Sequence, residues 1–139
     1  MPAAPSTASV PSTPLRSPFL TAALAWILPG AGHFLVGRRG RGLIVFFTVL
    51  AAFAVGLLMY GPMFQLGGAD VLTRLINTGG FVGDLASGIF YFLTIGCGYA
   101  QPDAGGHASD YGSKFLVVAG LLNILAMVDA YEIATRQKD

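Results

Sequence analysis

The chain has 139 residues, of which 54% are hydrophobic and 11% are charged, and its net charge is +1. The apolar share exceeds that of a typical soluble domain, and the charged share is less than half the usual one. A soluble fold of this size could not bury so much apolar surface, so we expect a membrane protein. Eight lysines and arginines are too few for the dense basic face that nucleic-acid binding requires. The single cysteine excludes an intramolecular disulfide and a CxxC metal or redox pair.

Residues 1–17, MPAAPSTASVPSTPLRS, are rich in proline, serine, alanine and threonine and contain no aromatic residue. Such a segment has too little apolar surface to form a packed core. We therefore predict a disordered N-terminal tail.

Four apolar runs follow the tail. The second contains no Asp, Glu, Lys or Arg, and about 20 residues at a rise of 1.5 Å per residue cover the hydrocarbon core of a bilayer. The third carries one charge, Asp84, in its first turn, and the fourth becomes long enough if Lys114 extends its ammonium group to the interface. We expect an all-α bundle of about four transmembrane helices, over 18–36, 43–61, 81–100 and 115–131. They form a membrane domain, 18–134, which is followed by a C-terminal tail, 135–139.

Two of these runs admit other interpretations. Run 18–36 is also compatible with a re-entrant segment or with a cleaved signal peptide, since small residues follow its apolar core. Run 115–131 is short enough for an interfacial or protein-buried helix. Between the second and third spans, the amphipathic piece 71–77 is expected to lie on the membrane surface.

Residues 29–42, PGAGHFLVGRRGRG, join the first two runs and predict a tight hairpin. Pro29 lacks a backbone N–H and opens the first helix near its end, which hydrocarbon tolerates only where polar groups pair with the freed carbonyls. His33 is well placed to be such a group. The turn itself requires residues that allow positive φ and close backbone approach. The five glycines expected to serve it are Gly30, Gly32, Gly37, Gly40 and Gly42.

Three arginines, Arg38, Arg39 and Arg41, give this hairpin a dense positive charge. In the four-span arrangement the eight basic residues divide equally between the two faces, so only their density can orient the protein. A dense basic cluster between two spans is hard to translocate, so we expect the hairpin in the cytoplasm and both termini outside. The arginines can also contact anionic lipid head groups at about 1 kcal/mol each, although topology alone accounts for them.

Two resemblances rest on these residues. The segment GAGHFLVGRRGRG resembles the Gly-rich, His-containing stretch and Gly-Arg turn of the bacterial two-transmembrane-helix hairpin domain known as TM-two, over roughly residues 22–60. More of the chain is similar to a family of bacterial membrane proteins of unknown function, through PGAGHF and through the C-terminal segment YGSKFLVVAGLLNILAMVDAYEIA, 111–134. This resemblance implies a multi-pass protein of the bacterial inner membrane, and it implies no activity.

The candidate functional side chains are the polar ones in or beside the apolar runs, because burying them in a membrane is costly. With four spans, His33 lies at the arginine turn, whereas Asp84 and Asp129 lie at the opposite face. Joining them in a metal site or proton relay would require a roughly 20 Å bridge that Asn123 alone cannot provide. We interpret His33 as a structural cap, and the two aspartates as interface anchors beside Arg74.

No catalytic, phosphate-binding, metal or haem motif is present in the sequence, so we expect no enzyme activity and no cofactor. The leading hypothesis is a structural or accessory subunit, or an interaction scaffold. Its partners would be the lipid bilayer and either other membrane proteins or further copies of this chain. The alternative is an oligomeric small transporter or channel in which Asn123 and the acidic residues line a shared path.

Overall fold

The computed structural model describes residues 17–99 and 106–136. Every regular element in these residues is a helix, which confirms the all-α class. In chain order the helices are α1 (Pro18–Ile27), α2 (Ala31–Leu35), α3 (Arg39–Leu58), α4 (Val71–Ala86), α5 (Ile89–Gly96) and α6 (His107–Arg136).

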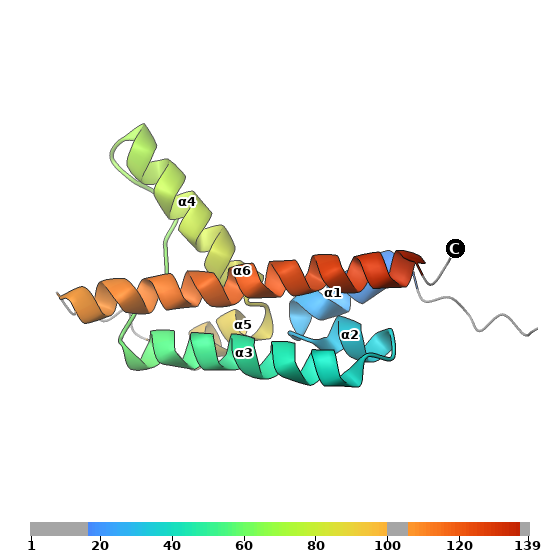
Figure 1. Ribbon diagram of the computed structural model, residues 1–139. Coiled ribbons are helices and arrows are strands. Elements are labelled where there is room, and N and C mark those ends of the chain that lie inside the picture. Colours follow the sequence, from blue (N-terminus) through green and yellow to red (C-terminus); the bar gives the residue numbers. More distant parts are fainter. Residues whose placement is uncertain (1–16, 100–105, 137–139) are drawn as a thin grey trace, which may run out of the picture.

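Two long helices, α3 and α6, lie side by side and run in opposite directions (Figure 1). Both are long and apolar enough to cross a membrane. The core between them contains Val49, Phe53 and Leu116. Each begins before its predicted span, at Arg39 and His107, because helical hydrogen bonding continues into the polar residues that precede the charge-free run.

The first apolar run does not form the single helix predicted over 18–36. α1 ends at Ile27, and α2 begins at Ala31 after a break that contains Pro29 and Gly30. Pro29 has no N–H with which to continue the helix, and Gly30 has a φ of 85°, in the left-handed region. α1 has 10 residues, too few to cross the hydrocarbon core of a bilayer.

The α1–α2 segment instead starts and finishes at the same end of the bundle. At the start of α1, the Phe19 ring lies 5.7 Å from that of Tyr131, near the end of α6. At the other end of α1, the Trp26 carbonyl reaches Asn123, halfway along α6. α2 then returns toward the start of α3. We call this end of the bundle, which carries Arg38, Arg39 and Arg41, the arginine end.

The third predicted span, 81–100, is also broken. α4 begins at Val71 and includes the piece expected on the membrane surface, and its axis makes an angle of 99° with that of α5. Gly88, with a φ of 66°, lies at the bend. A third crossing is counted only if α4 and α5 are taken as one bent span, so the described residues contain two or three candidate spans and not the predicted four.

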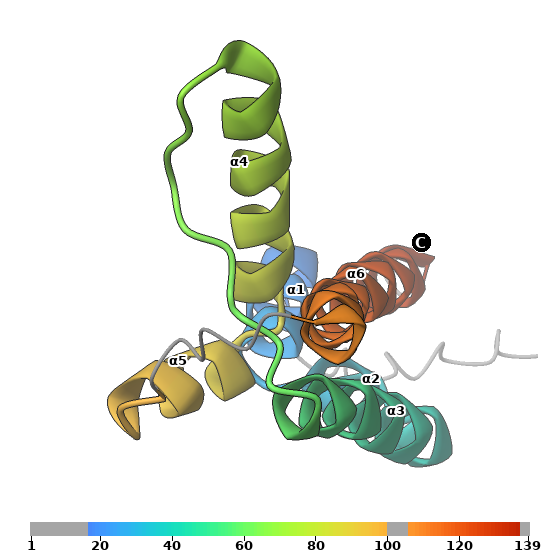
Figure 2. The same cartoon turned by 90° about the vertical axis from the view of Figure 1, so that its left-hand side faces the viewer.

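Helix α4 stands away from the other helices for most of its length (Figures 1 and 2). Only its C-terminal part packs against α6, where Gly83 and Gly120 bring the two backbones together. Close approach through small residues is how helices commonly pack in a membrane, where no hydrophobic effect drives them together. α4 is therefore packed on α6 at its C-terminal end, whereas its N-terminal half bonds to the loop that precedes it, through Arg74 and Asn77.

The glycines of the predicted hairpin differ in what the structure requires of them. Gly30 and Gly42 touch through their backbones, and Gly32 packs against side chains of α1 and α6. Gly37 has a φ of 81° in open space, so its role is conformational. The expectation that Gly40 allows close approach is wrong, because a Cβ there would meet nothing within 4 Å.

The predicted tails fall largely outside the described residues. Residues 1–16 and 137–139 are not among them, so the N-terminal tail stays a prediction. At the other end, α6 continues to Arg136, past the expected start of the C-terminal tail at residue 135.

Replacing Gly120 with alanine tests the contact between α4 and α6. The new methyl group would overlap the Gly83 carbonyl oxygen, so we expect a loss of about 1–3 kcal/mol, as for overpacking. The matched control is Gly40→Ala, which fills open space on a helix and should leave stability unchanged or raise it by up to about 1 kcal/mol. Thermal unfolding in detergent measures both, and equal midpoints would contradict the contact.

Candidate functional site

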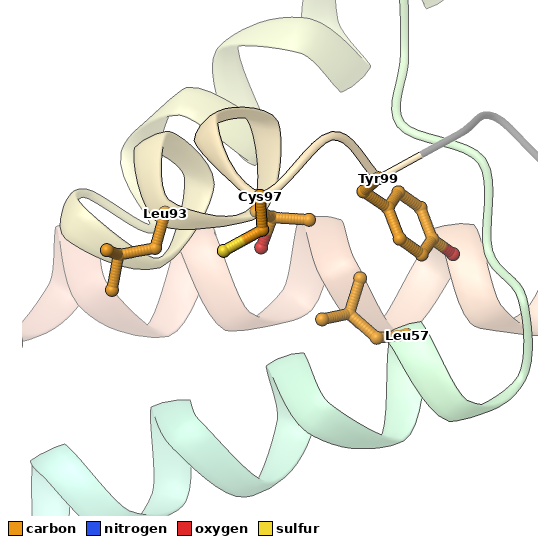
Figure 3. Close-up of a pocket in the computed structure, with 5 residues that line it drawn as sticks. Leu57, Leu93, Cys97 and Tyr99 are labelled. Atoms are coloured by element: carbon orange, nitrogen blue, oxygen red, sulfur yellow. The ribbon is translucent and has the colours of Figure 1, made fainter.

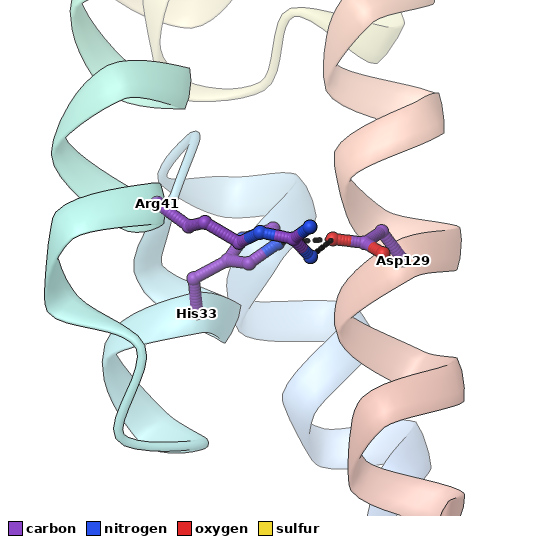
Figure 4. Close-up of polar contacts among 3 residues, drawn as sticks. All are labelled: His33, Arg41 and Asp129. Atoms are coloured by element: carbon purple, nitrogen blue, oxygen red, sulfur yellow. Dashed lines mark hydrogen bonds and ion pairs between the residues drawn. The ribbon is translucent and has the colours of Figure 1, made fainter.

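A cluster of three polar side chains joins α2, α3 and α6 at the arginine end (Figure 4). His33 Nε2 lies 2.8 Å from Asp129 Oδ2, and Arg41 Nη1 lies 3.1 Å from the same oxygen. The His33 side chain is 1% exposed, whereas those of Asp129 and Arg41 are about half exposed. The cluster therefore has a buried side and an open side.

The break at Pro29 produces this cluster. It turns α2 back toward α6, and Gly32 then packs against Ala130, so the neighbouring His33 meets Asp129. A carboxylate can only accept hydrogen bonds, so His33 carries a proton on Nε2. Its Nδ1 is buried and has no hydrogen-bond partner among the described residues.

This arrangement corrects the expected separation of His33 from Asp129 by the thickness of a membrane. That expectation assumed that the first and third runs each cross once. Because α2 returns to the arginine end, and because Tyr99, after α5, donates to the Gly61 carbonyl, after α3, α6 starts at the opposite end of the bundle and finishes at the arginine end. Asp129 is thus an ion-pair partner of Arg41, and Arg74 bonds instead to the Gly68 carbonyl.

Asn123 forms a second polar site, in the middle of α6. Its side chain is fully buried, and its amide nitrogen donates to the Trp26 carbonyl at 3.1 Å and to the Ala86 carbonyl at 2.9 Å. These carbonyls belong to the last turns of α1 and α4, where no further helical N–H follows to pair with them. Asn123 therefore caps two broken helices at once. Trp26 adds a third link, since its indole N–H donates to the Leu85 carbonyl at 3.2 Å.

Asp84 is not in the exposed first turn of a helix, where an interface anchor was expected. It is fully buried, and its Oδ2 accepts a hydrogen bond of 2.7 Å from the backbone N–H of Phe64. The expectation placed Asp84 in the first turn of a helix, but α4 begins thirteen residues earlier, at Val71. Asp84 is therefore near the buried end of α4, where it holds the loop that follows α3.

Ser109 and Ser113, which the sequence reasoning missed, fasten the opposite end of the bundle. Ser113 donates to the Pro62 carbonyl at 2.8 Å, and Ser109 donates to the Tyr60 carbonyl at 3.3 Å. Both lie before the charge-free run that defined the predicted span. Their spacing of four residues places them on one helix face, and this spacing was the signal in the sequence that could have identified them as a pair.

A shallow apolar pocket of about 300 Å³ lies between α3 and α5, lined by Leu57, Leu93, Thr94, Cys97 and Tyr99 (Figure 3). Cys97 is a free, exposed thiol at this pocket. No group of three or more histidine, cysteine or acidic side chains with the spacing of a metal site occurs in residues 17–99 and 106–136.

Asn123→Ala should destabilise the protein by about 1–3 kcal/mol, because it leaves two buried carbonyls without a donor. The control is Asn77→Ala, which removes an exposed bond to the Gly67 carbonyl and should have a much smaller effect. Thermal unfolding in detergent compares the two. A control that costs as much as Asn123→Ala would show that Asn123 does not hold the broken helices.

No curated protein and no solved structure matches this chain. One family model matches it over residues 20–139, which include every described helix except the first two residues of α1. The match confirms the expected relationship to a family of unknown function, while the resemblance to TM-two stays a prediction. The chain belongs to DUF6677, a family of unknown function.

Proposed function

We propose that this chain is an integral protein of the bacterial cytoplasmic membrane that serves as a structural or accessory subunit, with no catalytic activity of its own. In this proposal α3 and α6 cross the bilayer as an antiparallel pair. The α1–α2 and α4–α5 segments enter from opposite faces and return. Large apolar side chains exposed on the two crossing helices support contact with lipid, among them Ile44, Phe47, Leu58, Leu121 and Leu125.

The polar side chains of α6 support a structural role. Ser109, Ser113 and Asn123 each donate to a backbone carbonyl at or beside a helix end. In hydrocarbon, such carbonyls must find donors within the protein. These side chains are therefore used by the fold itself, which favours a scaffold over a pathway for a solute.

The free half of α4 is the observation that carries the proposed role. Val71, Leu72, Leu75 and Ile76 are 55–83% exposed, and most of this half of the helix stands away from the other helices, with only the loop before it alongside (Figure 2). A Cβ at Gly79 would meet nothing within 4 Å, so the backbone is open there to close approach. Exposed apolar side chains beside a small residue suit packing against another membrane helix. We propose that α4 presents this surface to a helix of a partner protein.

Gly79→Ile tests the role of α4. A branched side chain at Gly79 should block close approach of a partner helix, so the complex isolated in mild detergent should fall to the mass of the single chain. Gly96→Ile is the matched control, because that helical glycine is equally open and lies on α5. Light scattering measures the mass of the complex for the unsubstituted chain and for each variant. An unchanged mass for Gly79→Ile would mean that α4 contacts only lipid.

The positions of the basic residues support a revised orientation. Because α1 and α2 return, the start of α1 and the end of α6 both lie at the arginine end. Among the described residues that end carries Arg38, Arg39, Arg41 and Arg136, against Arg74 and Lys114 elsewhere. This excess favours a cytoplasmic arginine end. We therefore propose that the start of α1 and the end of α6 also face the cytoplasm, in place of the external termini expected from four spans.

Cysteine labelling in intact cells tests this orientation. In a Cys97→Ala background, Ala108→Cys places a thiol at the start of α6, and Gly40→Cys places one at the start of α3. Both positions are exposed. A membrane-impermeant thiol reagent should label Ala108→Cys in intact cells and Gly40→Cys only after lysis. The reverse pattern would invert the proposed orientation.

A transporter or channel is the second candidate. The observation in its favour is the fully buried Asp84, whose Oδ1 has no hydrogen-bond partner among the described residues. Buried acidic groups within membrane helices often belong to ion or proton pathways. An ion flux in proteoliposomes that disappears in Asp84→Asn would favour this function over the scaffold.

A further inference from the structure

A charged pocket of about 280 Å³ lies at the arginine end, between the first turn of α3 and the last two turns of α6. It is lined by Arg38, Arg41, Asp129, Glu132, Ile133 and Arg136. Three guanidinium groups and two carboxylates leave the lining with one excess positive charge. The pocket therefore complements a ligand that carries a single negative charge.

Several donors in this pocket are available to a ligand. Asp129 already accepts from His33 and Arg41, but Arg38 and Arg136 form no ion pair with any described residue. Helix α3 also begins here, and no side chain caps its first N–H groups. Arginine forks and free N–H groups at a helix start are both good donors to phosphate oxygens.

The surroundings of the pocket distinguish a lipid from a soluble phosphate. Glu132, Val128 and Leu125 are all exposed and follow one another on a single face of α6. This face leads from the charged pocket into the apolar part of the helix. A ligand with a phosphate group and an acyl chain would place the phosphate in the charged pocket and the acyl chain along the apolar face.

We propose that the pocket binds the phosphodiester of a singly charged phospholipid whose head group ends in hydroxyls, as in phosphatidylglycerol. Arg38 and Arg136 bind the phosphate, and the Glu132 carboxylate accepts a hydrogen bond from a hydroxyl. A head group that ends in an ammonium has no net charge and leaves the excess positive charge unmatched. A phosphomonoester carries more negative charge, which Glu132 and Asp129 repel. The inference rests on the proposed membrane location.

Native mass spectrometry of the full chain in mild detergent, with added lipids, tests this selectivity. The affinity for phosphatidylglycerol should be at least about fivefold higher than that for phosphatidylethanolamine or phosphatidic acid. A simple basic surface would instead prefer phosphatidic acid for its higher charge, and that result would overturn the proposal. Displacement of phosphatidylglycerol by an equal concentration of inorganic phosphate would also overturn it, since the ligand would then be the free anion.

Variants assign the binding to this pocket. Arg136→Gln and Arg38→Gln should each weaken phosphatidylglycerol binding about fivefold, the factor expected for one lipid-contacting arginine. Arg74→Gln, on α4, is the control and should leave binding unchanged. Glu132→Gln should raise the affinity for phosphatidic acid relative to phosphatidylglycerol. An equal loss in Arg74→Gln and Arg136→Gln would overturn the assignment.

This experiment is independent of the cellular orientation, because it uses purified protein. Inverted cysteine labelling with intact selectivity would contradict the topology and leave the lipid site standing. Correct labelling without selectivity would contradict the lipid site alone. Thermal unfolding of each variant confirms folding, which should persist because Arg38 and Arg136 form no ion pair with a described residue.

Discussion

The two hydrogen bonds of the Asn123 side chain connect the broken parts of this protein. One nitrogen atom donates to the last turn of α1 and to the last turn of α4. Neither helix crosses the bundle, so each ends among apolar side chains with carbonyls that need a donor. A single amide in the middle of α6 meets this need for both.

The long helix α6 is the element against which the others are placed. It contacts α1, α2, α3 and α4, and its polar side chains bond to groups near each of their ends. Small residues on α6 let the other backbones come close, as Gly120 does for Gly83 and Gly112 does for Gly61. Polar anchors and small residues thus alternate along α6, and together they set where each segment turns back.

The arginine end shows how one break changes the chemistry of a site. With α2 folded back, His33 is buried against Asp129, and Arg41 completes the cluster from α3 (Figure 4). Asp129 thus accepts hydrogen bonds from two donors, His33 and Arg41, whereas Arg38 and Arg136 form no ion pair with a described residue. The same fold therefore buries the His33 side chain and leaves a charged pocket beside it.

The sequence alone determined the helical class, the apolar runs that became α3 and α6, and the polar residues that matter, His33, Asn123 and Asp129. Composition and hydropathy are properties of single residues and short windows, so they were sufficient for these features. The tertiary structure decided whether the first and third runs cross or return. Pro29 predicted a break in the first helix. Whether the chain continues in the same direction after the break depends on which distant side chain donates to the free carbonyls at the helix end. Here that donor is Asn123, 97 residues from Trp26, and no local pattern encodes such a contact. The pairing of His33 with Asp129 depends on the same turning back of the chain. The number of times the chain crosses the bundle sets the end at which each later residue lies.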